Sequence, residues 1–180
     1  MDGINNQRRK KSLQCNVNYL ISSSYILTAA HCFDHVDVDS LSVVLGSDDL
    51  ETQGYHAIER SIDSYFVHPK YETCCHYYDV AIVKLFPRVP YDKDNPGITP
   101  ICLPTEASSN PDNRAGILVT LTGYGRTDSD RNNQQLSFTT LQIHSQRWCN
   151  HHYQEETYGS LPRQFESNII CAGYIVRRCT

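Results

Sequence analysis

Short runs of apolar and β-branched residues, each bounded by turn-forming residues, recur along most of this 180-residue chain. Residues 19–27 form the first run, residues 41–46 end in a glycine, and residues 117–125 end in Gly-Tyr-Gly. Segments of this length and composition favour β-strands, and short strands separated by turn signals favour a sandwich or a barrel. We therefore predict an all-β protein with a strand over each of the three runs.

Residues 58–67 carry the alternation that is typical of a half-buried strand. Ile58, Ile62 and Phe66 are separated by even intervals, so we expect them to share one face of an antiparallel strand. Residues 141–143 and 168–174 continue the β pattern in the second half.

A short helix is predicted near residues 145–155, because the hydroxyl of Ser145 can accept from the unpaired amides of a first helical turn. His151 and His152 lie in this segment. Adjacent residues of a helix point to different sides, so we interpret both histidines as surface residues and expect no metal between them.

The composition is that of an ordinary globular protein, with 39% hydrophobic and 20% charged residues. A formal net charge of -4 gives no basic footprint for nucleic acid. No apolar run approaches the roughly 20 residues that a membrane span needs. We expect no nucleic acid and no membrane as partners, and no cofactor.

Eight cysteines without a Cys-x-x-Cys pair indicate disulfides, which persist in oxidising compartments. We therefore expect an extracellular, secreted protein. The start of the chain has no apolar core of about 7 to 15 residues and so is no signal peptide. The expectation that reconciles these two observations is that residues upstream of Met1 are missing from this chain.

Cys74, Cys75 and His76 form an unusual cluster in the middle of the chain. Two adjacent cysteines cannot easily ligate one tetrahedral ion together, and no second ligand pair lies at zinc spacing. We interpret the cluster as a surface loop whose cysteines pair elsewhere or stay free, and we predict no metal site.

The main candidate chemistry is a histidine and an aspartate, each next to a predicted strand. His31 lies in Thr-Ala-Ala-His-Cys after the first run, with Cys15 and Cys32 on either side, and Asp79 heads Asp-Val-Ala-Ile-Val-Lys-Leu. A histidine that acts as a general base needs rigid support and an acidic group that fixes its tautomer. His31 and Asp79 are therefore the predicted base and its orienting residue.

This chain contains TAAHC, DVAIVKL, ICLP, GYG and CAG in that order. The corresponding motifs follow the same order in the chymotrypsin/trypsin-like serine endopeptidases, peptidase S1, which the sequence therefore resembles, although relatives more often have tryptophan in place of the tyrosine of GYG. The resemblance covers about residues 13–180. It implies two antiparallel β-barrels, of which residues 13–100 form the first and nearly complete one, and residues 116–180 form part of the second. Residues 101–115 connect them. The implied activity is proteolysis of protein or peptide substrates.

The family's nucleophilic serine lies in Gly-Asp-Ser-Gly-Gly, and this stretch does not occur in the 180 residues. We interpret the chain as truncated at both ends and expect it to be inactive alone. The alternative is a non-catalytic protease homologue that acts as a binding or regulatory protein, with a partner protease or a substrate as its ligand. Cleavage specificity is not predicted, because Arg177 takes the place of the family's specificity-determining aspartate only if Cys179 is in register.

The resemblance also implies a disulfide pattern, Cys15 with Cys32 and Cys149 with Cys171. In members with an N-terminal pro-segment, a cysteine in the Ile-Cys-Leu-Pro string joins the catalytic domain to that segment. Cys102 and Cys179 are therefore expected to lack partners within the chain, and the pairing of Cys74 and Cys75 stays open.

Two further expectations follow from the resemblance. Some relatives bind calcium through two carboxylates, but the corresponding positions are Ser47 and Ala57, so no calcium site is predicted. His31 and Asp79 are expected to lie within hydrogen-bond reach, about 2.6 to 3.2 Å, with the aspartate mostly buried.

Overall fold

The computed structural model describes residues 18–52, 54, 56–74, 77–90, 97–104, 114–124, 134–156 and 170–174. The chain divides into two compact units, residues Met1–Cys102 and Leu103–Thr180. This division falls within the predicted connection at residues 101–115, while the exact domain bounds remain a prediction.

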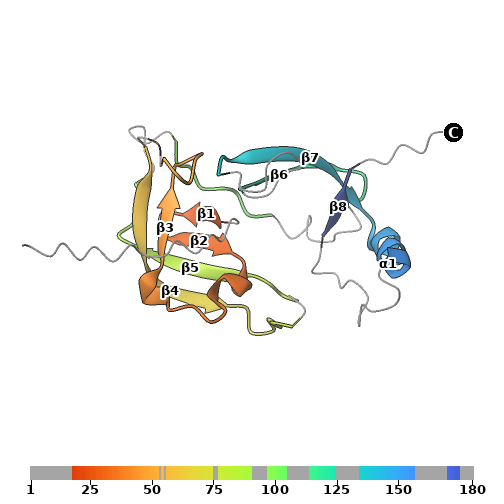
Figure 1. Ribbon diagram of the computed structural model, residues 1–180, viewed down its shortest axis with the longest axis horizontal. Helices are drawn as coiled ribbons and strands as arrows, with labels where there is room; N and C mark the ends of the chain where they lie inside the picture. Colours follow the sequence, from red (N-terminus) through yellow and green to blue (C-terminus); the bar gives the residue numbers. More distant parts are fainter. Residues whose placement is uncertain are drawn as a thin grey trace, which may run out of the picture. The chain divides into compact units, whose positions relative to one another are not determined.

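The first unit contains one antiparallel sheet of five strands that curls around its own apolar face (Figure 1). Its strand order is β1-β2-β5-β4-β3. The strands are β1 (Asn18–Ser22), β2 (Tyr25–Thr28), β3 (Ser42–Leu45), β4 (Ile58–Val67) and β5 (Ala81–Phe86). Two 3-10 turns, η1 (Ala30–Phe33) and η2 (Val38–Ser40), lie between β2 and β3.

Residues 19–27 form a hairpin, so the prediction of one continuous strand there is wrong. Ser23 and Ser24 make the turn between β1 and β2, and the amide of Ser24 donates to Ser22 Oγ at 3.3 Å. Folding back brings the buried residues Leu20 and Ile26 opposite each other. A hydroxyl that can bond its neighbouring backbone favours a turn over a strand, which explains the break.

The prediction for Phe66 is also wrong, because β4 contains a bulge. Between Ile62 and Ser64, β4 advances two residues while β5 advances one. A bulge of this kind changes which later residues point inward. Ile58 and Ile62 pack against the core, whereas Phe66 is 62% exposed and lies opposite Ile82, which is 39% exposed.

The core of the first unit lies on the inner face of the curled sheet. Its buried residues are Leu20, Ile26, Val83, Leu85, Val89 and Ile98. Burying an aliphatic side chain of this size contributes roughly 1.5 to 3 kcal/mol. Gly46 closes one end of the core with a φ of +74°, and a Cβ there would approach Ile98 Cγ1 to 2.9 Å.

The second unit contains a three-stranded antiparallel sheet and one helix. The order β6-β7-β8 is formed by β6 (Leu118–Gly123), β7 (Ser137–His144) and β8 (Cys171–Gly173), and α1 (Gln146–Glu156) follows β7. The mostly β content and antiparallel pairing of both units confirm the all-β prediction. Among the described helices, none is long and apolar enough to cross a bilayer.

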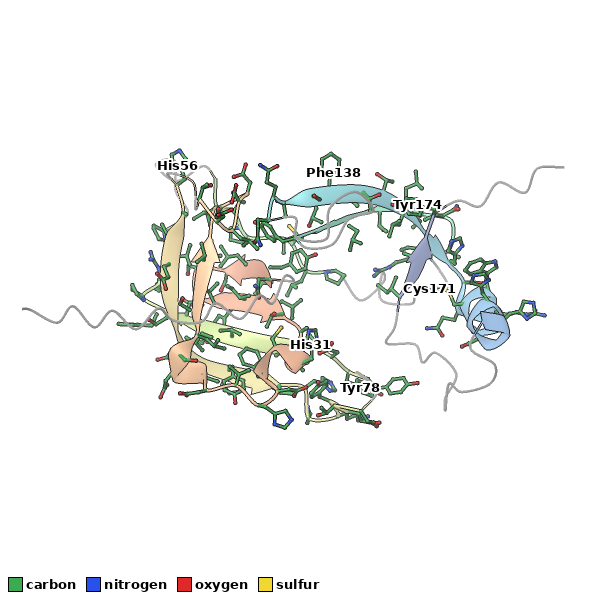
Figure 2. The ribbon with its side chains drawn as sticks, viewed as in Figure 1. His31, His56, Tyr78, Phe138, Cys171 and Tyr174 are labelled. Carbon is green, nitrogen blue, oxygen red and sulfur yellow. A yellow bond between two sulfur atoms is a disulfide. The ribbon has the colours of Figure 1, made fainter. Side chains whose placement is uncertain are left out.

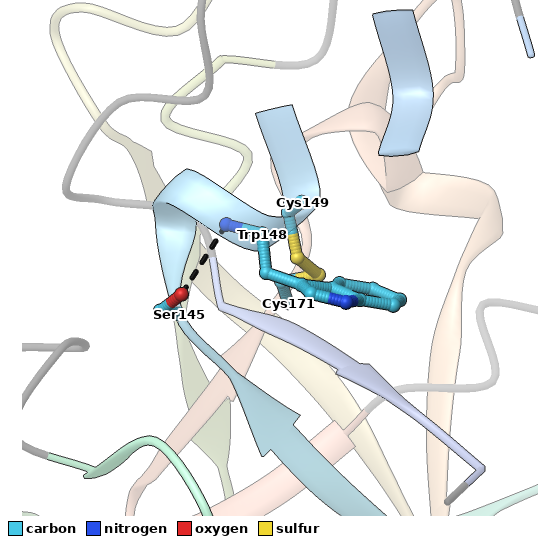
Figure 3. Close-up of a disulfide and its surroundings, with 4 residues drawn as sticks. All are labelled: Ser145, Trp148, Cys149 and Cys171. Atoms are coloured by element: carbon cyan, nitrogen blue, oxygen red, sulfur yellow. Dashed lines mark hydrogen bonds between the residues drawn. A yellow bond between two sulfur atoms is a disulfide. The ribbon is translucent and has the colours of Figure 1, made fainter. Parts of the chain in front are cut away.

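Helix α1 begins where the sequence predicts. The amide of Trp148 donates to Ser145 Oγ at 3.2 Å, which is the expected N-cap (Figure 3). A disulfide between Cys149 and Cys171 joins the helix to β8, with the two Cα atoms 6.4 Å apart. The cap and the disulfide together fix α1 against the sheet.

Candidate active site

His31 is held by the short turn η1, directly after β2. Its neighbours Ala30 and Cys32 are both buried, so the turn is anchored on either side of the histidine. Cys32 is disulfide-bonded. The predicted partner, Cys15, lies outside the described residues, and the pairing remains a prediction.

Asp79 binds His31 through both carboxylate oxygens. His31 Nδ1 and Asp79 Oδ2 are 2.7 Å apart, and the backbone amide of His31 donates to Asp79 Oδ1 at 2.9 Å. The side chain of Asp79 is 22% exposed, while that of His31 is 47% exposed. The predicted geometry is confirmed, with the aspartate mostly covered and the histidine accessible. His31 is labelled in Figure 2, on the turn that follows β2.

The pairing of β2 with β5 explains why residues 48 positions apart meet. Thr28, the last residue of β2, lies opposite Ala81, the first residue of β5. The strands are antiparallel, so the chain that leaves β2 and the chain that enters β5 are at the same end of the sheet. His31 follows Thr28 by one short turn and Asp79 precedes Ala81, which brings the two side chains together.

Hydrogen bonding keeps Asp79 ionised. Burial alone would raise its pKa, but the hydrogen bonds from the side chain and the backbone of His31 outweigh burial and lower the pKa of Asp79 below its ordinary value. An ionised carboxylate can only accept, so Nδ1 of His31 carries the proton in this hydrogen bond. In neutral His31, Nε2 is then the accepting nitrogen, as a general base requires.

The loop that leads into Asp79 contains a backbone feature that the sequence does not reveal. Tyr78 has a φ of +53°, which is unusual for a bulky residue. Its ring stacks on His68 at 4.9 Å with an interplanar angle of 5°, and Lys70 Nζ lies 5.5 Å from its centroid. These contacts stabilise the left-handed conformation directly before Asp79. No local pattern in a single sequence marks such a position.

Asp34 and Tyr71 are two further residues near the pair that sequence reasoning missed. The hydroxyl of Tyr71 donates to Asp34 Oδ2 at 2.7 Å, across 37 positions of sequence. Asp34 directly follows η1, and Tyr71 lies in the loop before Asp79. Only the folded sheet brings these two segments together, so neither residue stands out in the sequence.

The remaining candidates lie apart from this pair or outside the described residues. Within the described ranges, no group of three or more His, Cys, Asp and Glu residues is arranged to hold a metal ion. Cys74 and Cys102 are exposed, whereas Cys75, His76 and Cys179 fall outside those ranges.

The two predicted surface histidines of α1, His151 and His152, are both exposed. His152 stacks on Trp148 at 4.8 Å, and Trp148 stacks on His144 at 4.1 Å. The indole of Trp148 therefore stacks with the imidazoles of both His144 and His152.

Comparison with curated sequences gives relatives that share most of this chain. A venom protease of Bombus pensylvanicus is 31% identical, with 96% of this chain and 67% of the relative covered. Trypsin II-P29 of Gallus gallus is 30% identical over 87% of this chain and 56% of the relative. Clotting factor G beta subunit of Tachypleus tridentatus is 30% identical over 86% of this chain, which spans half of that relative.

The fold has a solved counterpart. The structure of neuropsin, a serine protease expressed in mouse brain, superposes with a TM-score of 0.68 at 23% identity, covering 88% of this chain and 63% of that one. A model of the Trypsin family matches residues 5–179. The chain belongs to the Trypsin family of serine proteases.

Proposed function

We propose that His31 and Asp79 are the general base and the orienting acid of a trypsin-like serine endopeptidase. The observation that carries the proposal is the bond between His31 Nδ1 and the ionised Asp79, at 2.7 Å, beside an accessible imidazole. Membership of the Trypsin family supports the same assignment. The substrates would be proteins or peptides.

In the proposed reaction, Nε2 of His31 takes the hydroxyl proton of a serine as the serine Oγ attacks a peptide carbonyl carbon. The imidazolium then gives this proton to the leaving amine nitrogen as the peptide C–N bond breaks. Asp79 holds the imidazole in one tautomer and stabilises its protonated form, without taking the proton itself. A water molecule attacks the resulting ester in the second half, and His31 repeats the same proton transfer.

The nucleophile is the part of the proposal that the 180 residues do not contain, because Gly-Asp-Ser-Gly is absent from them. The proposed enzyme therefore needs a polypeptide segment that carries this motif next to His31. A chain without such a segment would instead act as a non-catalytic homologue that binds a partner protease. Reading the coding sequence on both sides of the 180 codons distinguishes these two products.

An extracellular location and a pro-segment are further parts of the proposal. Relatives carry names such as clotting factor and venom protease, which fits action outside the cell. The disulfides Cys149–Cys171 and, as proposed, Cys15–Cys32 also fit an oxidising compartment. The exposed thiol of Cys102 is where a pro-segment would be joined.

The test uses the chain extended by a C-terminal segment that carries Gly-Asp-Ser-Gly-Gly, assayed with a panel of peptide amides and a serine-directed fluorophosphonate. We expect hydrolysis and labelling of one serine, both lost in His31→Ala. His151→Ala is the matched control, because His151 is exposed on α1 in the second unit. Activity that survives His31→Ala would contradict the proposal.

A further inference from the structure

Two segments of the first unit carry the His31–Asp79 pair, and a second hydrogen bond joins the same two segments. The Tyr71 hydroxyl donates to Asp34 Oδ2 at 2.7 Å, and both groups are partly buried. The amide of Asp34 donates to the carbonyl of His31 at 3.2 Å, which ties the Asp34 side of this bond to the turn that holds the histidine.

The other side of the bond is tied to Asp79. The amide of Tyr71 donates to the His68 carbonyl at 2.9 Å, and the amide of His68 donates to the Val80 carbonyl at 3.0 Å. Val80 is the residue next to Asp79. The contacts therefore form a closed path from His31 through Asp34, Tyr71, His68 and Val80 to Asp79, and back to His31.

We propose that Tyr71, acting through Asp34, is a positioning residue for the His31–Asp79 pair. This inference rests on the proposed function, because only a catalytic pair needs its geometry held closely. With the Asp34–Tyr71 bond present, η1 and the loop before Asp79 cannot separate unless this bond breaks together with the two bonds that Asp79 accepts from His31. Without it, fewer hydrogen bonds hold the two segments together at this end of the sheet.

The surroundings of Tyr71 suit a permanent donor. Burial, the hydrogen bond to Asp34, and the charges of Asp34 and Asp79 raise the pKa of Tyr71 to about 12, against a smaller opposing effect of a hydrogen bond with Thr73. The phenol therefore stays protonated at neutral pH.

The experiment measures the rate at which the Nδ1 proton of His31 exchanges with solvent, by NMR on the full chain with labelled histidine. His31→Gln identifies the resonance. The unsubstituted chain should show a slowly exchanging proton, because opening of the pair limits its exchange. Tyr71→Phe keeps the ring and removes only the donor, and we expect exchange about tenfold faster.

Three further variants separate positioning from general stability. Asp34→Ala should match Tyr71→Phe, whereas Asp34→Asn keeps an acceptor oxygen and should stay within about threefold of the unsubstituted chain. Tyr174→Phe is the matched control, because it removes a tyrosine hydroxyl that lies 3.2 Å from Thr139 Oγ1 in the second unit. In all four variants, Tyr71→Phe included, the backbone amides of the core residues Ile26 and Val83 should exchange at the same rate as in the unsubstituted chain.

Three outcomes would overturn the inference. Unchanged exchange of the His31 Nδ1 proton in both Tyr71→Phe and Asp34→Ala would show that the Asp34–Tyr71 hydrogen bond does not position the His31–Asp79 pair. An equal increase at His31 and at the core amides would show a general loss of stability. If the unsubstituted chain gave no protected Nδ1 proton, the His31–Asp79 bond itself, and with it the proposed function, would fail as well.

Discussion

Strand β5 of the first unit buries Ala81, Val83 and Leu85 on one face, whereas β6 of the second unit has no buried residue. On β6, Leu118 and Leu121 are exposed instead. The first unit therefore fixes its geometry by packing, and its candidate site lies at the end of the packed strands β2 and β5. The second unit depends more on a disulfide and a helix cap.

This difference predicts that one buried aliphatic side chain in the first unit contributes more to the free energy of unfolding than one exposed aliphatic side chain in the second. Ile26→Ala removes a fully buried side chain and should lower the free energy of unfolding by about 2 to 5 kcal/mol. Leu121→Ala, at 54% exposure, should change it by no more than about 0.5 kcal/mol.

The changes in the free energy of unfolding of both variants are measured by urea unfolding, with hydrogen exchange of the β5 and β6 amides as the probe of each unit. A loss for Leu121→Ala as large as that for Ile26→Ala would show that the second unit also relies on packing at this face.

Removing the disulfide should have the next largest effect, and only in the second unit. Cys149 and Cys171 are 22 residues apart, and closing a loop of this length contributes about 3 kcal/mol. We expect Cys149→Ser combined with Cys171→Ser to speed exchange in β7, β8 and α1. Cys102→Ser is the matched control, because Cys102 is an exposed thiol without a disulfide. Faster exchange in β5 would contradict the assignment.

The helix cap gives a smaller effect. Ser145→Ala removes the oxygen that accepts from the Trp148 amide at 3.2 Å, and loss of such a cap costs about 1 kcal/mol. Exchange of the first-turn amides of α1 should increase, while Ser145→Asp should retain protection because aspartate also caps. Equal exchange in the alanine variant and the unsubstituted chain would show that the disulfide alone holds this turn.

The smallest effect we expect is on acid stability, because solvent screens the interactions of the partly exposed Asp79. Its folded-state pKa is lowered by His31, against the opposing effect of burial. The stabilisation is therefore present above the unfolded-state pKa of about 3.9 and is lost as the pH falls through the lower folded value.

Urea unfolding between pH 5 and about pH 2 measures this loss. Asp63 and Asp49 also have lowered pKa values, so the informative quantity is the difference between Asp79→Asn and the unsubstituted chain. Asp79→Asn should show the weaker dependence on pH. Identical dependence in both proteins would mean that Asp79 gains nothing from His31 in the folded state.

Local patterns in the sequence predict what depends on local chemistry. Short motifs and the family resemblance are enough to predict strands β3, β6 and β7, the Ser145 cap, and the candidate pair His31 and Asp79. A period-2 pattern does not predict the bulge at Ile62–Ser64, because it assumes that every residue advances the strand equally. It therefore places Phe66 on the wrong face.

Contacts between distant segments could not be predicted where the family resemblance does not imply them. The pairing of Thr28 with Ala81 sets the position of the pair, and the Asp34–Tyr71 bond joins residues 37 positions apart. Both arise from the folded sheet, and a single sequence carries no local signal for either. The left-handed Tyr78 is a further case, since its contacts come from His68 and Lys70, ten and eight positions earlier, and no local motif indicates them.

The most direct test of the central claim, that Asp79 orients His31 as a general base, is the kcat for peptide amides of the extended chain with and without Asp79→Asn. Asparagine fills the same space but favours the wrong histidine tautomer, and in the family's template triad this change lowers kcat by about 10⁴-fold. We predict a loss of that order, while Asp63→Asn, which weakens an exposed ion pair with Lys84, should leave kcat within about twofold. An Asp79→Asn enzyme as active as its parent would contradict the account.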